Sequence, residues 1–209
     1  VACGSAYHVG MVGKYALEKL LHIPVEACLA SEFRYSEPLL GESALVIVIS
    51  QSGETLDSMA ALREAKRKGS KVLSIVNVMG SSIARGADYV LYTWAGPEIA
   101  VATTKAYTTQ MVLLLMFGVY LAKQLDRMEQ EEYMAVTRGL QELPEKISFV
   151  LSDIDHYQKA ASRYFNHNSV FYIGRNLDYA LGLEGSLKLK EISYIHSESY
   201  AAGELKHGT

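Results

Sequence analysis

The chain has few cysteines, and its sequence shows no metal-binding pattern. Only Cys3 and Cys28 occur among 209 residues, and two cysteines cannot form a disulfide framework. We therefore expect a reduced, cytoplasmic setting. No group of Cys, His and carboxylate residues has the spacing of a metal site, so no bound metal is expected.

Excess positive charge, long apolar runs and nucleotide-binding motifs are also absent from the sequence. The 20 Lys and Arg residues against 23 Asp and Glu residues give a net charge of −3, which argues against a nucleic-acid partner. The longest apolar run, Met111 to Ala122, is shorter than the about 20 residues of a membrane span, so it predicts a buried helix. No G-x-x-x-x-G-K-[ST] motif occurs, and no G-x-G-x-x-G motif follows a strand.

The hydrophobic pattern predicts an α/β fold. Hydrophobic residues make up 49% of the chain and charged residues 21%, as in globular proteins. Short apolar runs alternate with amphipathic helical segments, which predicts an open parallel sheet with helices on both faces. The expected strands lie at residues 1–3, 25–29, 44–49, 71–77 and 89–92.

A change in composition suggests a division of the chain. Residues 126–132 are rich in charge, and residues 131–164 predict two helices broken near Pro144. Residues 169–176 then repeat the strand, glycine and small turn of residues 1–5. The expected parts are a first domain at 1–128, linking helices at 129–159 and the beginning of a second, similar domain at 160–209. We expect the chain to be a piece of a longer protein.

The stretch Ser50-Gln51-Ser52-Gly53-Glu54-Thr55 is the most informative loop. It joins the buried strand 44–49 to an amphipathic helix at 56–68. Free N–H groups at a helix N-terminus suit an anion, above all a phosphate. The alternative is an ordinary helix cap made by Ser52 or Thr55. Since Gly4-Ser5 also follows a predicted strand, the two turns are expected to line one pocket.

A second group of polar side chains lies near the end of the chain. Glu184, Lys188 and Glu191 are spaced to share one face of a helix, where a carboxylate held by an ammonium can act as a proton-transfer base. The alternative is a solvated stripe of ion pairs. The residues that follow, 195–208, are rich in titratable and small side chains and predict a loop.

Two further side chains have open interpretations. His207 is either a surface or capping histidine or a proton shuttle, because its pKa lies near neutrality. Cys3 is either a nucleophile or a small buried residue at a strand end.

Several stretches together resemble the isomerase (SIS) domains of the glutamine–fructose-6-phosphate aminotransferase family. They are residues 30–35, 50–55, 103–110, 187–196 and 203–208, and the resemblance covers essentially the whole chain. It implies a three-layer α-β-α sandwich with a parallel, flavodoxin-like sheet, followed by the start of a second SIS domain. It also implies fructose 6-phosphate and glucosamine 6-phosphate as ligands, with no cofactor.

The resemblance assigns roles to named residues. Glu191 would move a proton between C1 and C2, Lys188 would assist it, and His207, reaching in from a neighbouring subunit, would open the sugar ring. A homodimer and an upstream glutaminase domain are therefore implied. The residues expected to bind the substrate are Cys3, Gly4, Ser5, Ser50, Gln51, Ser52, Thr55, Val101 and Thr103.

Two positions depart from the family, and two other functions stay open. Thr103 stands where family members commonly carry a serine, but it keeps the hydroxyl. Ala6 stands where family members usually carry a hydroxyl, so the resemblance does not carry over one of the phosphate contacts. The alternatives are a non-catalytic SIS sensor of a sugar phosphate and a related SIS isomerase or deglycase without a glutaminase domain. The 209 residues alone are expected to be inactive in synthesis.

Overall fold

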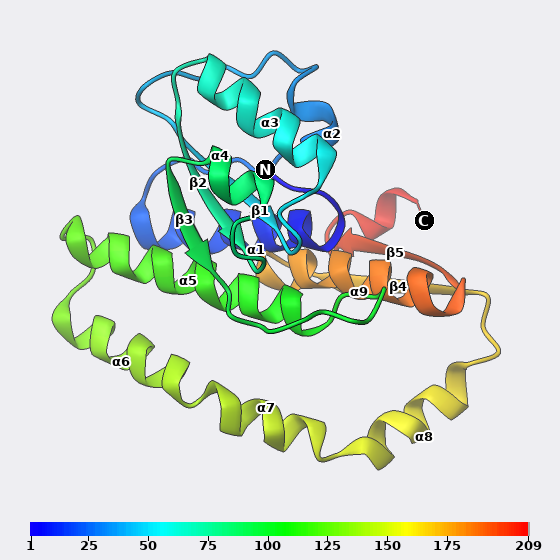
Figure 1. Ribbon diagram of the computed structural model, residues 1–209. Coiled ribbons are helices and arrows are strands. Elements are labelled where there is room, and N and C mark those ends of the chain that lie inside the picture. The colour runs from blue at the N-terminus through cyan, green and yellow to red at the C-terminus, as the bar shows by residue number, and fades with distance from the viewer. Residues whose placement is uncertain (209) are drawn as a thin grey trace.

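The computed structural model describes residues 1–208 and has a parallel sheet at its centre (Figure 1). The strands β1 (Leu45–Ser50), β2 (Lys71–Val76) and β3 (Tyr89–Tyr92) lie side by side in that order. Val46 pairs with Val72 and Ile49 with Ile75, so β1 and β2 run in register along their whole length. The predicted α/β fold with a parallel sheet is confirmed.

The two earliest predicted strands are reduced to a single bridge. Ala2 pairs with Leu29 in parallel, and the amide of Ile49 donates to the carbonyl of Val1 at 3.1 Å. These segments thus extend the sheet beyond β1, but only locally. Helix α1 (Gly4–Leu21) begins two residues after Ala2, which leaves little extended chain to pair.

Helices cover both faces of the sheet, which makes three layers. Helices α2 (Ala30–Phe33), α3 (Leu56–Arg67) and α4 (Ser82–Gly86) lie on one face, and α1 and α5 (Lys105–Gln124) lie on the other (Figure 1). Side chains of a strand alternate between faces. In β1, Val46 and Val48 pack toward α3, whereas Ile47 and Ile49 pack toward α1 and α5.

Helix α5 packs closely along α1. Gly13 and Gly118 permit the approach: a Cβ on Gly13 would lie 2.4 Å from Leu114 Cδ2, and one on Gly118 would lie 2.4 Å from Leu17 Cδ2. By length and composition α5 could also cross a membrane. Its buried residues and its contacts with α1 are those of a core helix, as the apolar run 111–122 predicts.

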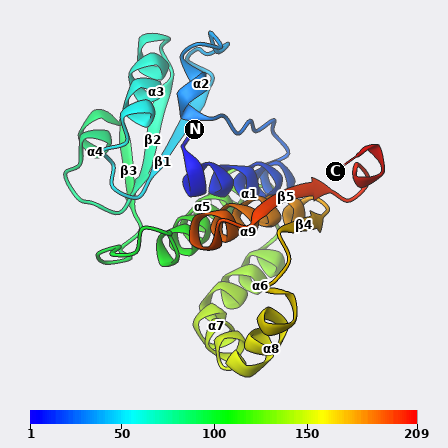
Figure 2. The same cartoon turned by 90° about the vertical axis from the view of Figure 1, so that its right-hand side faces the viewer.

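Three helices, α6 (Gln130–Gln141), α7 (Leu143–Leu151) and α8 (Ile154–Tyr164), follow α5 and extend away from the sheet (Figures 1 and 2). The predicted break near Pro144 is present. The prediction of only two helices is wrong, because a second break falls at Asp153, whose carboxylate accepts the amide of His156 at 3.3 Å and caps α8.

The chain then returns to the body in a second parallel unit. Strand β4 (Ser169–Gly174) leads into α9 (Leu177–Ser193), and β5 (His196–Ala201) pairs with β4 before the short helix η1 (Leu205–His207). The prediction of a loop is wrong for residues 196–201. These residues are mostly polar and so do not show the apolar pattern of a strand. Ser197 is nevertheless fully buried, and it exchanges hydrogen bonds with Ser186. Helix α9 packs against α1. The division at 128 and 160 stays a prediction.

Candidate functional site

A pocket of about 200 Å³ opens at the carboxyl end of β1. Its walls come from the start of α1, the loop before α3, the segment around the start of α5, and the last turn of α9. It gathers most of the residues predicted to form the site. The lining residues are Cys3, Ser5, Ala6, Ile49, Ser50, Gln51, Ser52, Thr55, Thr103, Gln110 and Glu191.

Hydrogen bonds among its own residues shape the loop before α3. Ser50 Oγ accepts the amide of Gly53 at 3.0 Å and lies 3.0 Å from Thr55 Oγ1. Ser52 Oγ accepts the amide of Glu54 at 3.2 Å. Thr55 directly precedes α3, yet its side chain does not bond to the amides of the helix. The alternative of an ordinary cap therefore does not describe Thr55, and the N-terminus of α3 lies at the pocket without a side-chain cap.

Gly53 and Glu54 hold this loop against α4. Gly53 has a φ of +66°, and a Cβ there would lie 2.0 Å from Ser81 Oγ. Glu54 Oε1 accepts the amide of Ser82 at 2.7 Å, and hydrogen bonding from Ser82 holds the pKa of this carboxyl below its usual value. The only carboxylate of the loop is thus engaged with α4 and does not line the pocket.

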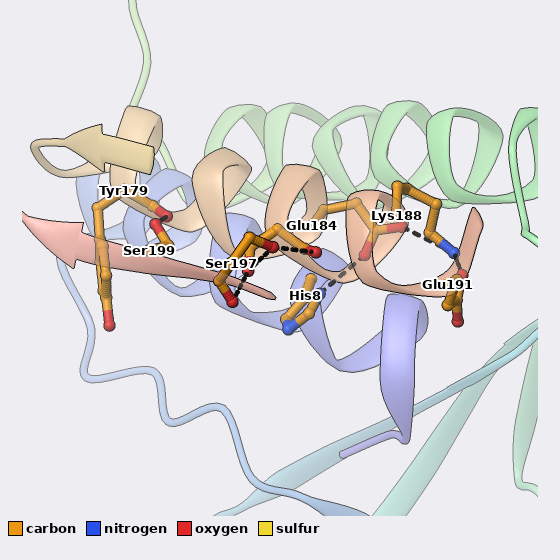
Figure 3. Close-up of polar contacts among 8 residues, drawn as sticks. His8, Tyr179, Glu184, Lys188, Glu191, Ser197 and Ser199 are labelled. Carbon is orange, nitrogen blue, oxygen red and sulfur yellow. Dashed lines mark hydrogen bonds and ion pairs between the residues drawn. The ribbon is translucent and has the colours of Figure 1, made fainter. Parts of the chain in front are cut away.

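Glu184, Lys188 and Glu191 lie along α9, and Glu191 belongs to the pocket lining; Figure 3 shows the contacts of these three side chains. Lys188 Nζ bonds to Glu191 and lies 3.6 Å from Glu184 Oε1. On its other side, Glu184 Oε2 lies 2.8 Å from Nδ1 of His8, which belongs to α1. Glu184 is only 6% exposed, so a fully solvated stripe does not describe this group. These successive contacts hold Glu191 in the wall of the pocket.

Some predicted site residues lie outside the pocket lining. Gly4 begins α1 beside it, and Lys188 reaches it only through Glu191. Val101 is fully exposed in the loop before α5. His207 is exposed in η1, near the C-terminal end and beyond β5 (Figure 2). Roles for these residues stay predictions.

Gln110 and His8 are the polar residues near the site that sequence reasoning missed. Gln110 interrupts an apolar row on α5 between Ala106 and Leu114, one turn away on each side, and a polar residue on a buried face is an available signal. His8 offers no such signal, because its partner Glu184 is 176 residues away along the chain. Among residues 1–208, no group of three His, Cys, Asp or Glu side chains could hold a metal ion.

A comparison with family models identifies the fold family. The model described as SIS domain matches residues 1–120 and 163–209. The chain belongs to the SIS domain family. Over its whole length this SIS chain is 59% identical to the glutamine–fructose-6-phosphate aminotransferase (isomerizing) of Caldanaerobacter subterraneus and 55% identical to that of Clostridium acetobutylicum. It spans 34% of the length of each of these relatives.

Solved structures agree with this family. The C-terminal domain of glucosamine-fructose-6-phosphate aminotransferase from Francisella tularensis is 38% identical, with a TM-score of 0.96. The match covers 99% of this chain and 59% of that structure. A glucosamine-6-phosphate deaminase from Thermotoga maritima, at 24% identity and a TM-score of 0.78, shares the fold over 99% of this chain and 61% of its own.

Proposed function

We propose that this SIS chain is the sugar-phosphate isomerase part of a glutamine–fructose-6-phosphate aminotransferase. It would bind fructose 6-phosphate and convert the aminated ketose to glucosamine 6-phosphate. One observation carries the proposal: the pocket joins the hydroxyl-rich loop 50–55 to Glu191, about 140 residues later in the chain. The first can hold an anion and the second can move a proton.

The phosphate would lie against the loop before α3. Ser50, Gln51, Ser52 and Thr55 line the pocket, and the positive end of the α3 dipole lies beside them, so their hydroxyls and amides would bind the phosphate. Cys3 and Ser5 border the same space from the start of α1. Such a site binds the substrate at a distance from the reacting carbons, which lets binding energy position them.

Glu191 would carry the proton transfer. Its carboxylate takes a proton from C1 of the aminated ketose and returns it to C2, which converts the ketose into the aldose. Lys188 holds the carboxylate in place through their ion pair, while Thr103 lines the same pocket, where it would lie beside the sugar. In the net reaction, one proton moves from C1 to C2 and a second leaves the C1 hydroxyl while the imine nitrogen gains one, so the conversion is redox-neutral within the substrate and we propose no metal or organic cofactor for it.

The remaining parts of the proposal concern the assembly. His207 is exposed and outside the pocket of its own chain, which suits a histidine that serves a neighbouring subunit in a homodimer. Ammonia would come from a glutaminase domain of the longer protein, and the enzyme would act in the cytoplasm. The 209 residues alone would not perform synthesis.

Ligand binding and proton exchange test the function separately. Glucosamine 6-phosphate at about 100 times its dissociation constant should stabilise the chain by roughly 2.7 kcal/mol. The double substitution Ser52→Ala and Thr55→Ala should abolish this gain. In D₂O the aminotransferase containing this chain should exchange the C1 proton of its substrate, and Glu191→Gln should stop the exchange. Binding without exchange in the unsubstituted enzyme would favour the sensor instead.

A further inference from the structure

Gln110 is the polar residue of the pocket that the proposed function leaves without a role. It lies on α5, is 2% exposed, and lines the pocket together with Thr103 and Glu191. Its Nε2 atom is buried and has no hydrogen-bond partner within residues 1–208. The large majority of buried side-chain polar atoms in folded proteins have such a partner. An unpaired amide at the edge of a pocket therefore calls for a partner from outside the chain.

The position of Gln110 places it near the reacting carbons of a bound sugar phosphate. The loop 50–55 leads into α3 on one face of the sheet, whereas α5 lies on the other face. Helix α9, which carries Glu191, packs against α1 on that second face. Gln110 thus borders the pocket from the side where the reacting carbons would lie.

The chemistry of an amide agrees with that position. The loop 50–55, which includes the amide of Gln51, and the α3 dipole already supply donors for a phosphate dianion, so the phosphate does not need a further neutral amide from α5. A carboxamide can donate through its nitrogen and accept through its oxygen, and a half-turn of its last torsion exchanges the two ends. A sugar hydroxyl, which also donates and accepts, is the matching group.

We propose that Gln110 is a specificity-determining residue whose amide hydrogen-bonds a hydroxyl of the sugar chain at the Glu191 end of the pocket. This inference rests on the proposed function, because it needs a sugar phosphate in the pocket. It predicts that Gln110 distinguishes a sugar phosphate from free phosphate, a distinction that the loop 50–55 does not make.

The test compares two probes, inorganic phosphate and fructose 6-phosphate, by titration of the chain and its variants. Gln110→Met removes the amide at similar length, and Gln110→Leu does so with a different shape. Gln124→Met is the matched control, because Gln124 is exposed at the end of the same helix. Both Gln110 variants should bind fructose 6-phosphate roughly 3- to 10-fold more weakly, the loss of one hydrogen bond, and inorganic phosphate as before.

Stability separates a ligand contact from a structural one. Since the amide nitrogen has no partner among the described residues, its removal should leave the unfolding midpoint unchanged or raise it. Unchanged fructose 6-phosphate affinity in both variants would overturn the inference and leave the proposed function standing. So would equal weakening of both probes together with a lower midpoint. Failure of the unsubstituted chain to bind fructose 6-phosphate would overturn the proposed function and this inference with it.

Discussion

The contact between His8 and Glu184 should contribute measurably to the stability of the fold. His8 Nδ1 and Glu184 Oε2 are 2.8 Å apart, and their side chains are 13% and 7% exposed. A hydrogen bond to a charged group contributes about 1.5–3 kcal/mol. In His8→Ala the Glu184 carboxylate keeps only Lys188, whose Nζ lies 3.6 Å from its other oxygen. We therefore expect His8→Ala to lower the free energy of unfolding by about 2–3 kcal/mol.

A double-mutant cycle measures the contact itself. Urea unfolding of the unsubstituted chain, His8→Ala, Glu184→Ala and the double variant gives the coupling free energy, for which we expect about 1–2 kcal/mol. In thermal unfolding, each kcal/mol should lower the midpoint by about 2–4 °C for a chain of this size. Lys146→Ala is the control. It removes the Lys146–Glu142 pair of 2.8 Å on the exposed surface, and we expect no measurable change.

The cycle can also refute the reasoning. A coupling below about 0.5 kcal/mol would mean that the two side chains do not stabilise each other, whatever their distance. A Lys146→Ala variant as unstable as His8→Ala would show that burial of the contact is not what matters. Because the pair joins α1 to α9, an observed coupling would also show that this contact helps to hold the two helices together.

Three further predictions concern single residues near the site. Gly53→Ala should lower the free energy of unfolding by about 1–3 kcal/mol, because it places a side chain at a φ of +66° with its Cβ 2.0 Å from Ser81 Oγ. Adding Ser81→Gly to the same chain should recover part of the loss, which thermal unfolding measures. Ala6→Ser should add a hydroxyl to the pocket wall and tighten inorganic phosphate binding roughly 3- to 10-fold in a titration, and no gain would place the anion elsewhere. Burial, with the nearby Glu184 charge, raises the pKa of Tyr107 to about 12. The free energy of unfolding should therefore fall as pH rises from about 10, because the tyrosine of the unfolded chain ionises first. Tyr107→Phe should reduce this loss, as measured by urea unfolding at successive pH values.

The local pattern of apolar residues was sufficient to predict the helices and strands that bury apolar side chains. The strand β1 was predictable because Val46, Ile47, Val48 and Ile49 form a continuous apolar run covered on both faces. The strand β5 was not, because a serine can be buried if another serine exchanges hydrogen bonds with it, as Ser197 does with Ser186. Such a pair has no hydrophobic signature.

The candidate site also combines local features, which the sequence predicts, with tertiary contacts, which it does not. The loop 50–55 and the spacing of Glu184, Lys188 and Glu191 are local features, and the pocket lining includes Glu191 and every loop residue except Gly53 and Glu54. The partnership of Glu184 with His8 depends on how α9 packs against α1, which no local spacing encodes. The orientation of Glu54 toward α4 likewise depends on Ser82, 28 residues later.

Helices α6, α7 and α8 have a consequence for how the pocket is assembled. They bury no residue of their own, yet they link the part that carries the loop 50–55 to the part that carries Glu191. The three helices act as a linker that sets the effective concentration of the part with Glu191 near the part with the loop 50–55. A chain cut within it would become a split protein. Its two fragments would form the pocket only as often as their concentrations allow them to meet.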